Sequence, residues 1–228
     1  AEQALYWVDI PAGRLHRWSA MTGQTQNWQA EEMLACIARH SDGGWVAGME
    51  SGFFHLHPHS DGSLDSELLA TVAHSRADMR LNDGRCDRQG RFWAGSMVLN
   101  MGLNTPEGRL YRYGAGQSGV IAAQLDGFIV PNGLGFSPDG KTMYLSDSHP
   151  DVQLIWAFDY DTETGTPSNR RIFVDMNHFP GRPVMPEMDH LDARCLKNPA
   201  HDMNGRVMAV KKSRRRDDAV SAARPTSP

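Results

Sequence analysis

The fold is decided by the stretch VPNGLGFSPDGKTMYLSDS, residues 130–148, in which two short apolar segments flank a Ser-Pro-Asp-Gly turn. In such a turn proline presets φ and glycine accepts a positive φ. The first segment opens with Pro131-Asn132-Gly133, where an amide oxygen at a turn could meet a cation or a substrate hydroxyl. An isolated Asn-Gly pair would indicate only a turn. Here its setting recurs along the chain, and the recurrence predicts the fold.

Four segments share the same pattern of two alternating strands joined by a short connection. Their aromatic anchors are 38, 48 and 51 residues apart: Trp7, Trp45, Trp93 and Tyr144. A period of about 40 to 50 residues built from strands is typical of propeller blades. We therefore predict an all-β chain, a β-propeller with about four blades over residues 1–183, and rank a β-sandwich second. Residues 30–38 lean toward helix, but a strand entering the second blade explains them equally well.

Charge divides the chain in two. Residues 1–183 carry 14 Lys and Arg against 21 Asp and Glu, whereas residues 184–228 carry 9 against 6. The blade pattern also stops at this point, so we predict a partial propeller over 1–183 and a divergent basic tail over 184–228, disordered or read out of frame. Three cysteines, odd in number and far apart, indicate a reducing compartment and thus a cytoplasmic protein. No apolar run approaches the roughly 18 residues of a membrane span.

Residues 80–97, RLNDGRCDRQGRFWAGSM, resemble the regucalcin/SMP-30 or gluconolactonase family. The combination of Asn-Asp-Gly with Phe-Trp-Ala-Gly is far more specific than either motif alone. The resemblance extends in order over about residues 1–183, with supporting motifs at 5–10, 131–134 and 171–175. It implies a six-bladed propeller that holds one divalent cation at the mouth of its central channel and hydrolyses sugar lactones.

The resemblance also implies roles for four residues. Asn132 matches the family's metal-binding asparagine, Arg80 a substrate-contacting arginine, and Asn82 a polar residue lining the metal and substrate site. Asn100 falls where some members place a substrate-binding glutamate, which weakens that contact. Hard cations prefer oxygen ligands, so Ca²⁺ is the first expectation, with Zn²⁺, Mg²⁺ and Mn²⁺ as alternatives. The plainer interpretations are a simple turn at Asn82 and a surface position for Arg80.

Two departures from the family pattern affect the expected chemistry. The family's metal-binding glutamate precedes the Leu5-Tyr6-Trp7 motif, and this chain begins after that point. The position of its metal-binding, general-base aspartate is Val184, so we identify no catalytic residue. We therefore expect a family member truncated at both ends, in which two of three metal ligands are missing. The prediction is metal-dependent hydrolysis of a sugar lactone; the alternative is a non-catalytic propeller remnant or binding module that has lost the metal site.

Other clusters of functional side chains are weaker signals. Glu187, Asp189, His190 and Asp192 could form a substitute metal site, but such clusters are common by chance. The basic run at 211–216 lacks stacking aromatic residues, so a solvated tail is favoured over a nucleic-acid site. Three histidines alternate along one strand, and a solvent-facing outer strand is favoured over a transition-metal site: His55, His57 and His59. The expected partner is a small-molecule sugar lactone, with neither a membrane nor nucleic acid.

Overall fold

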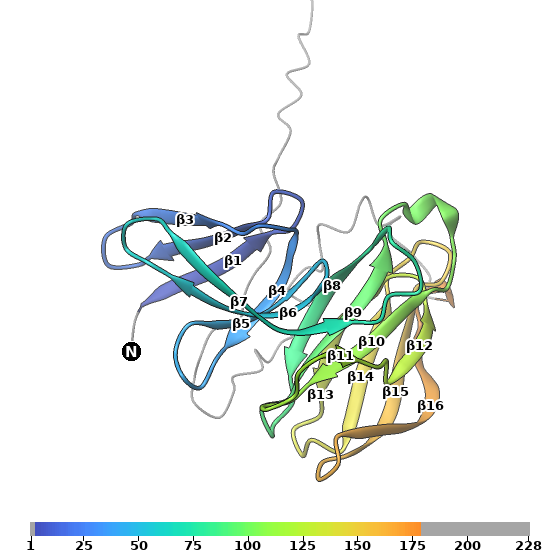
Figure 1. The fold of residues 1–228 in the computed structure, drawn as a ribbon. Coiled ribbons are helices and arrows are strands. Elements are labelled where there is room, and N and C mark those ends of the chain that lie inside the picture. The colour runs from blue at the N-terminus through green and yellow to red at the C-terminus, as the bar shows by residue number, and fades with distance from the viewer. Residues whose placement is uncertain (1–2, 179–228) are drawn as a thin grey trace, which may run out of the picture.

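A computed structural model describes residues 3–178, which form sixteen strands arranged as four sheets that follow one another in chain order (Figure 1). The first sheet contains β1 (Ala4–Asp9), β2 (Arg14–Ser19) and β3 (Thr25–Gln29). The second contains β4 (Leu34–Arg39), β5 (Trp45–Met49), β6 (Gly52–Pro58) and β7 (Leu64–Val72). The short β11 (Val120–Ile121) adds to β7 in parallel.

The third sheet contains β8 (Met79–Cys86), β9 (Phe92–Val98), β10 (Gly108–Tyr113) and β12 (Leu125–Phe128). The fourth contains β13 (Pro131–Phe136), β14 (Thr142–Asp147), β15 (Leu154–Asp161) and β16 (Thr166–Asp175). The described helices are two 3-10 turns, η1 (Met101–Leu103) and η2 (Met176–His178), and neither is long enough to span a membrane. The all-β propeller prediction is confirmed, with four blades in the described part of the chain.

Three of the four aromatic anchors occupy equivalent places in their sheets. Trp45, Trp93 and Tyr144 lie on the second strands β5, β9 and β14, while Trp7 lies on β1. The first strands of the later sheets, β4, β8 and β13, pack against one another in sequence and form the inner side of the blades. Residues 34–39 form β4, so the strand interpretation of segment 30–38 was the right one.

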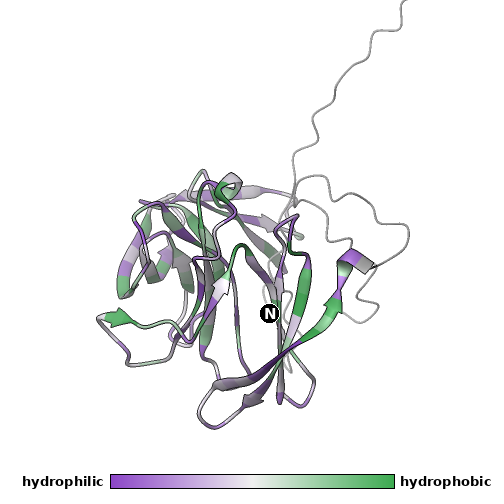
Figure 2. Cartoon of the chain, turned by 90° about the vertical axis from the view of Figure 1, so that its right-hand side faces the viewer, coloured by the Kyte–Doolittle hydropathy of each residue, from purple (hydrophilic) through white to green (hydrophobic). Residues whose placement is uncertain are grey.

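Apolar side chains fill the space between consecutive sheets. Figure 2 shows hydrophobic stretches along the strands and hydrophilic ones at most turns. Between the third and fourth sheets, Trp93, Phe128 and Phe158 are fully buried in one cluster. The glycine of the Phe-Trp-Ala-Gly motif permits this close approach, because a Cβ on Gly95 would lie 2.8 Å from the Pro131 ring. The motif therefore combines a buried aromatic anchor with a contact point for the next blade.

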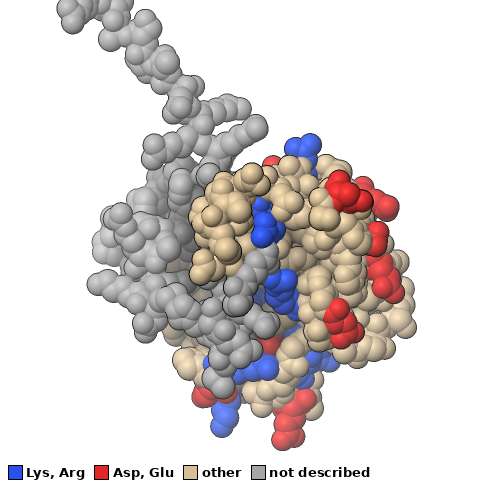
Figure 3. Space-filling view, turned by 90° about the vertical axis from the view of Figure 1, so that its left-hand side faces the viewer, with Lys and Arg blue, Asp and Glu red and all other residues tan. Residues whose placement is uncertain are grey.

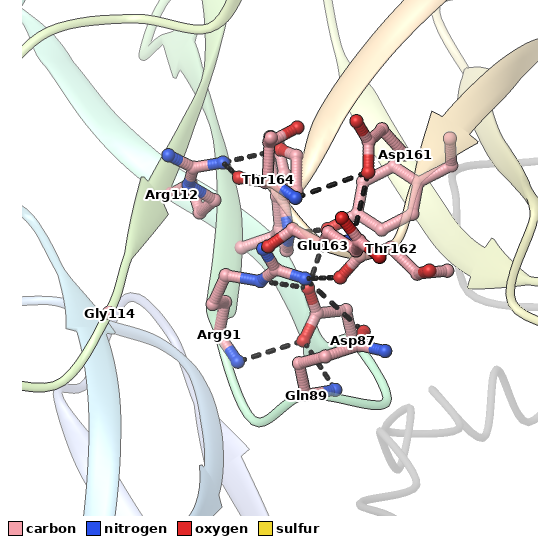
Figure 4. Close-up of polar contacts among 12 residues, drawn as sticks. Asp87, Gln89, Arg91, Arg112, Gly114, Asp161, Thr162, Glu163 and Thr164 are labelled. Carbon is pink, nitrogen blue, oxygen red and sulfur yellow. Dashed lines mark hydrogen bonds and ion pairs between the residues drawn. The ribbon is translucent and has the colours of Figure 1, made fainter.

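A buried ion pair joins the third and fourth sheets at the end of β8 (Figure 4). The Asp87 carboxylate accepts hydrogen bonds from Arg91 Nε at 2.6 Å and from the Tyr160 hydroxyl at 2.5 Å. The Arg91 guanidinium then donates to two backbone carbonyls of the β15–β16 turn, those of Thr162 and Glu163. Burial, followed by the bond to Asp87, raises the pKa of Tyr160. Asp87 thus ties a turn of one blade to a turn of the next.

The histidines of β6 correct one expectation. His55 is only 8% exposed, so the solvent-facing interpretation is wrong for this residue. Its ring contacts the rings of His40 and His57 at centroid distances of 3.9 and 4.0 Å. His55 Nε2 lies 2.8 Å from the Gly43 carbonyl and therefore carries the hydrogen, which leaves Nδ1 to accept from His57 Nε2 at 3.3 Å. His59 lies past the end of β6 and pairs with Asp65.

We predict that Asp87→Ala destabilises the protein far more than the loss of an exposed ion pair does. The Asp87 side chain is 1% exposed, and its removal leaves the partly buried Arg91 charge uncompensated, which typically costs about 3 to 5 kcal/mol. Asp159→Ala, which breaks a half-exposed pair with Arg171, should cost below about 1 kcal/mol. Urea unfolding of both variants measures the difference, and equal losses would contradict the role of Asp87.

We predict that the free energy of unfolding falls as the pH is lowered, because of His40. Burial, and then the neighbouring His55, lower the pKa of His40, so the unfolded chain takes up a proton before the folded chain does. Protonation of the unfolded state below about pH 6.5 therefore favours unfolding. The thermal midpoint of the wild type should drop between about pH 7.5 and about pH 5.5, and the drop should be smaller in His40→Asn. His59→Asn is the control and should retain the wild-type drop.

Candidate functional site

The candidate site lies where the inner strands β8 and β13 begin. The two strands run side by side in the same direction. Their contacts show this, since residues farther along β8 bond to residues farther along β13. Asn82 bonds to the Pro131 carbonyl, Arg85 to the Leu134 carbonyl and, beyond β8, Arg88 to the Ser137 carbonyl, each 49 residues away. Arg80 and Asn132, the second residues of their strands, therefore lie at the same end of the propeller.

Both strands contain a bulge at this end. The pairing of β8 with β9 shifts register between Leu81 and Gly84, and that of β13 with β14 shifts between Asn132 and Gly135. A bulge releases backbone groups from the sheet ladder and redirects the side chains next to it. Gly133 adopts a φ of 59° within the second bulge, a left-handed conformation that favours glycine. The Asn-Gly pair is therefore part of a bulged inner strand.

Arg80 and Asn82 form one hydrogen-bonded unit. The Arg80 guanidinium donates from Nη1 to the Asn82 Oδ1 atom at 2.9 Å and to the Leu81 carbonyl at 2.9 Å. Asn82 is only 5% exposed, and its Nδ2 donates to the Pro131 carbonyl at 3.1 Å. Burial lowers the pKa of the half-buried Arg80. The buried amide therefore connects the arginine to the residue preceding Asn132.

Asn132 is half-buried, and two serines, one on β14 and one just after it, hold it in place. Its Nδ2 donates to the Ser148 hydroxyl at 3.4 Å, and its backbone carbonyl accepts from the Ser146 hydroxyl at 2.9 Å. Its Oδ1 atom accepts the backbone N–H of Gly133 at 2.9 Å. The structure thus brings Asn132 into the same hydrogen-bonded cluster as Arg80 and Asn82, linked through Pro131.

Asp83 also belongs to this cluster, although sequence reasoning gave it no role. Its Oδ2 atom accepts the backbone N–H of Gly133 at 2.8 Å. Burial raises the pKa of Asp83, while backbone N–H groups of Gly133, Gly84 and Leu134 act in the opposite direction. The signal that could have identified it is its position between Asn82 and Gly84 in the Asn-Asp-Gly motif.

Asn100 is placed differently. It is exposed and caps η1, with its side-chain oxygen accepting the Gly102 N–H at 3.1 Å. The bonds identified within residues 3–178 do not link it to Arg80, Asn82 or Asn132. Its loop instead contacts the connection between β14 and β15 of the fourth sheet, where the Asn104 amide donates a hydrogen bond to Asp151 at 2.9 Å. The structure therefore brings together three of the four residues expected at the site.

The described residues do not complete a metal site. The site contains oxygen donors of the type that a hard cation prefers, but Ca²⁺ takes about six to eight of them. Within residues 3–178 there is no group of three or more His, Cys, Asp and Glu side chains that could hold a metal. Val184 lies outside the described residues, as do the acidic cluster at 187–192 and the basic run at 211–216.

An open hollow of about 480 Å³ lies between the second and third sheets. It is lined by Glu32, Glu50, His74, Arg76 and neighbouring residues, and by none of the four residues expected at the site. The hydrogen-bonded cluster of β8 and β13 therefore remains the candidate functional site.

The chain resembles several known proteins in sequence. The sequence profile described as "SMP-30/Gluconolactonase/LRE-like region" matches residues 1–223. A 6-deoxy-6-sulfogluconolactonase of Pseudomonas putida is 38% identical over 92% of this chain and 68% of its own length. A pentonolactonase of Haloferax volcanii is 32% identical over 80% of this chain and 58% of its own length.

A solved structure has the same fold. Regucalcin from Agrobacterium tumefaciens, described as a calcium-binding protein, superimposes with a TM-score of 0.67 at 25% identity, covering 76% of this chain and 56% of that one. The chain thus spans a little over half to about two thirds of the length of these relatives. With the matched profile, the shared motifs and the common fold, the chain belongs to the SMP-30/gluconolactonase/LRE-like family.

Proposed function

We propose that this protein acts on a sugar lactone, with hydrolysis of the ring ester as its reaction. The observation that carries the proposal is the contact between β8 and β13, in which Arg80 bonds to Asn82 at 2.9 Å and Asn82 bonds to the carbonyl of Pro131, the neighbour of Asn132, at 3.1 Å. Two relatives support the substrate class, because both are named as lactonases of sugar acids.

The chemistry of the three side chains suits a polyhydroxylated lactone. A guanidinium donates several hydrogen bonds from a fixed plane, so Arg80 can bind ring hydroxyls or the carbonyl oxygen of the substrate. Asn82 holds Arg80 in place through its Oδ1 atom, and Asn132 offers an amide oxygen at the same end of the channel. We assign substrate binding to Arg80 and Asn82, with Asn100 as a peripheral contact.

The proposal includes one divalent cation, held in part by Asn132. Ca²⁺ is the first choice, since a regucalcin of the same fold is described as calcium-binding, with Zn²⁺, Mg²⁺ and Mn²⁺ as alternatives. Asn132 is one ligand of such an ion. We also propose a reducing, cytoplasmic location, in keeping with the free thiols of Cys36 and Cys86.

A second candidate function is lactone binding without turnover. Two observations favour it: valine at position 184 cannot accept a proton, and the described residues contain no three-ligand metal group. Hydrolysis without a positioned base is slower by about two to four orders of magnitude. Binding requires only the arginine and the two asparagines, so it does not depend on that base.

The described surface favours a small molecule over nucleic acid. On the face in Figure 3, acidic side chains lie along the right-hand side and at the bottom, and basic ones lie at the top, in the middle and at the bottom, so this face carries both signs. Strong phosphate binding needs a continuous basic surface. The partner we propose is the sugar lactone alone.

Calorimetry and turnover together separate the two candidate functions. We expect Ca²⁺ to bind with one-to-one stoichiometry, gluconolactone to be hydrolysed, and Asn132→Ala to abolish both. Binding of gluconolactone without turnover or ion binding would instead support the second candidate. If the wild-type chain neither binds nor hydrolyses gluconolactone, with Zn²⁺, Mg²⁺ and Mn²⁺ also tested, the proposed function is wrong.

Arg80→Lys should weaken the use of the substrate without unfolding the protein. A lysine keeps the charge but loses the planar donors, and one charge-assisted hydrogen bond is worth about 1.5 to 3 kcal/mol, so kcat/KM should fall at least about tenfold. The control is Arg88→Lys, an exposed arginine farther along the chain that bonds to the Ser137 carbonyl at 3.4 Å. Equal kinetics in the two variants would exclude Arg80 from the site.

A further inference from the structure

We propose that Asp83 is a positioning residue for Asn132, whose amide oxygen it keeps available to a ligand at the channel mouth. The inference rests on the proposed function, because it concerns the same site. It starts from one N–H group with two acceptors. The backbone N–H of Gly133 lies 2.8 Å from Asp83 Oδ2 and 2.9 Å from Asn132 Oδ1.

The two acceptors compete for this hydrogen. An ionised carboxylate is a stronger acceptor than a neutral amide. The Asp83 carboxylate therefore takes the larger share of the Gly133 N–H and reduces the hold of that group on the Asn132 oxygen. Without Asp83, Asn132 Oδ1 becomes the sole acceptor of the pair, and its existing bond to the Gly133 N–H is strengthened. The amide oxygen would then be held more firmly by its own backbone.

The backbone at this point needs an external restraint. Gly133 is exposed and has a φ of 59°, and glycine populates many other conformations at little cost. Gly133 has no partner in the β13–β14 register, because the bulge between Asn132 and Gly135 interrupts the pairing there. Asp83 comes from a different sheet and lies in the bulge of β8, so it restrains the turn from outside. Asp83 thereby couples the third blade to the conformation of the Asn132 turn.

The same contact explains why an aspartate suits this position. The backbone N–H of Gly133 bonds to Asp83 Oδ2 at 2.8 Å, and the N–H groups of Gly84 and Leu134 also favour the ionised carboxylate, so they oppose the rise of its pKa on burial. Three N–H donors are matched by a group that has only acceptors. An asparagine would present its own N–H₂ to one side of this arrangement and lose part of it. An alanine would leave these N–H groups without their shared acceptor.

The test is nuclear magnetic resonance of the ¹⁵N-labelled full chain. In Asp83→Ala the backbone amide proton of Gly133 should move upfield, because it loses a charged acceptor, and the side-chain NH₂ signals of Asn132 should move with it. Asp83→Asn should give smaller shifts in the same direction. Tyr160→Phe is the matched control: it removes a bond to Asp87 at the other end of the same blade contact and should leave both signals unchanged.

Turnover of gluconolactone provides the second readout. Loss of a residue that orients a ligand-binding group typically costs about 10- to 100-fold, so Asp83→Ala should lose activity to that extent, whereas Tyr160→Phe should keep it. Unchanged Gly133 and Asn132 signals in Asp83→Ala would overturn the inference. If that variant does not fold, Asp83→Asn decides by the same two signals. If the wild type hydrolyses no lactone, the proposed function fails, while the resonance shifts still decide the role of Asp83.

Discussion

The structure depends on how β8 and β13 are held side by side. The inner strands of neighbouring blades are not joined by a backbone ladder, so side chains must provide the connection. Asn82 donates to the Pro131 carbonyl, Asp83 accepts from the Gly133 N–H, and Arg85 donates to the Leu134 carbonyl at 3.4 Å. One strand thus supplies polar side chains and the other supplies backbone groups. Because these side chains must be polar, the contact between blades also creates the candidate site.

The two ends of this blade contact have different properties. At the far end, Asp87 is 1% exposed and bonds to Arg91 and Tyr160, so its charge is used within the protein. At the candidate site, Asn132 and Asp83 are only half-buried. A firm contact at one end allows the other to retain polar groups that do not contribute fully to stability. Functional sites commonly occupy such less stable regions of a rigid scaffold.

The sequence predicted the blades because their signals are local. The anchors Trp45 and Trp93 repeat within alternating strands, and β5 and β9 formed where they were expected. The meeting of Asn82 and Asn132 followed only from the family resemblance, since 50 residues separate them. The role of Asp83 was missed because it depends on two bulges facing each other. The burial of His55 was missed because strand alternation does not reveal which face meets His40.

Recognition and turnover of a lactone place different demands on the chain. In the proposed function, recognition depends on Arg80, Asn82 and Asn132, which lie on two adjacent strands and are fixed by contacts within one blade pair. Turnover would also need a positioned base and the remaining ligands of an ion, and the described residues contain no group of three or more His, Cys, Asp and Glu side chains that could hold a metal. Loss of turnover therefore would not require loss of binding. Because Asn82 also bonds β8 to β13, the packing of these two strands constrains this residue whether or not the protein turns over a substrate.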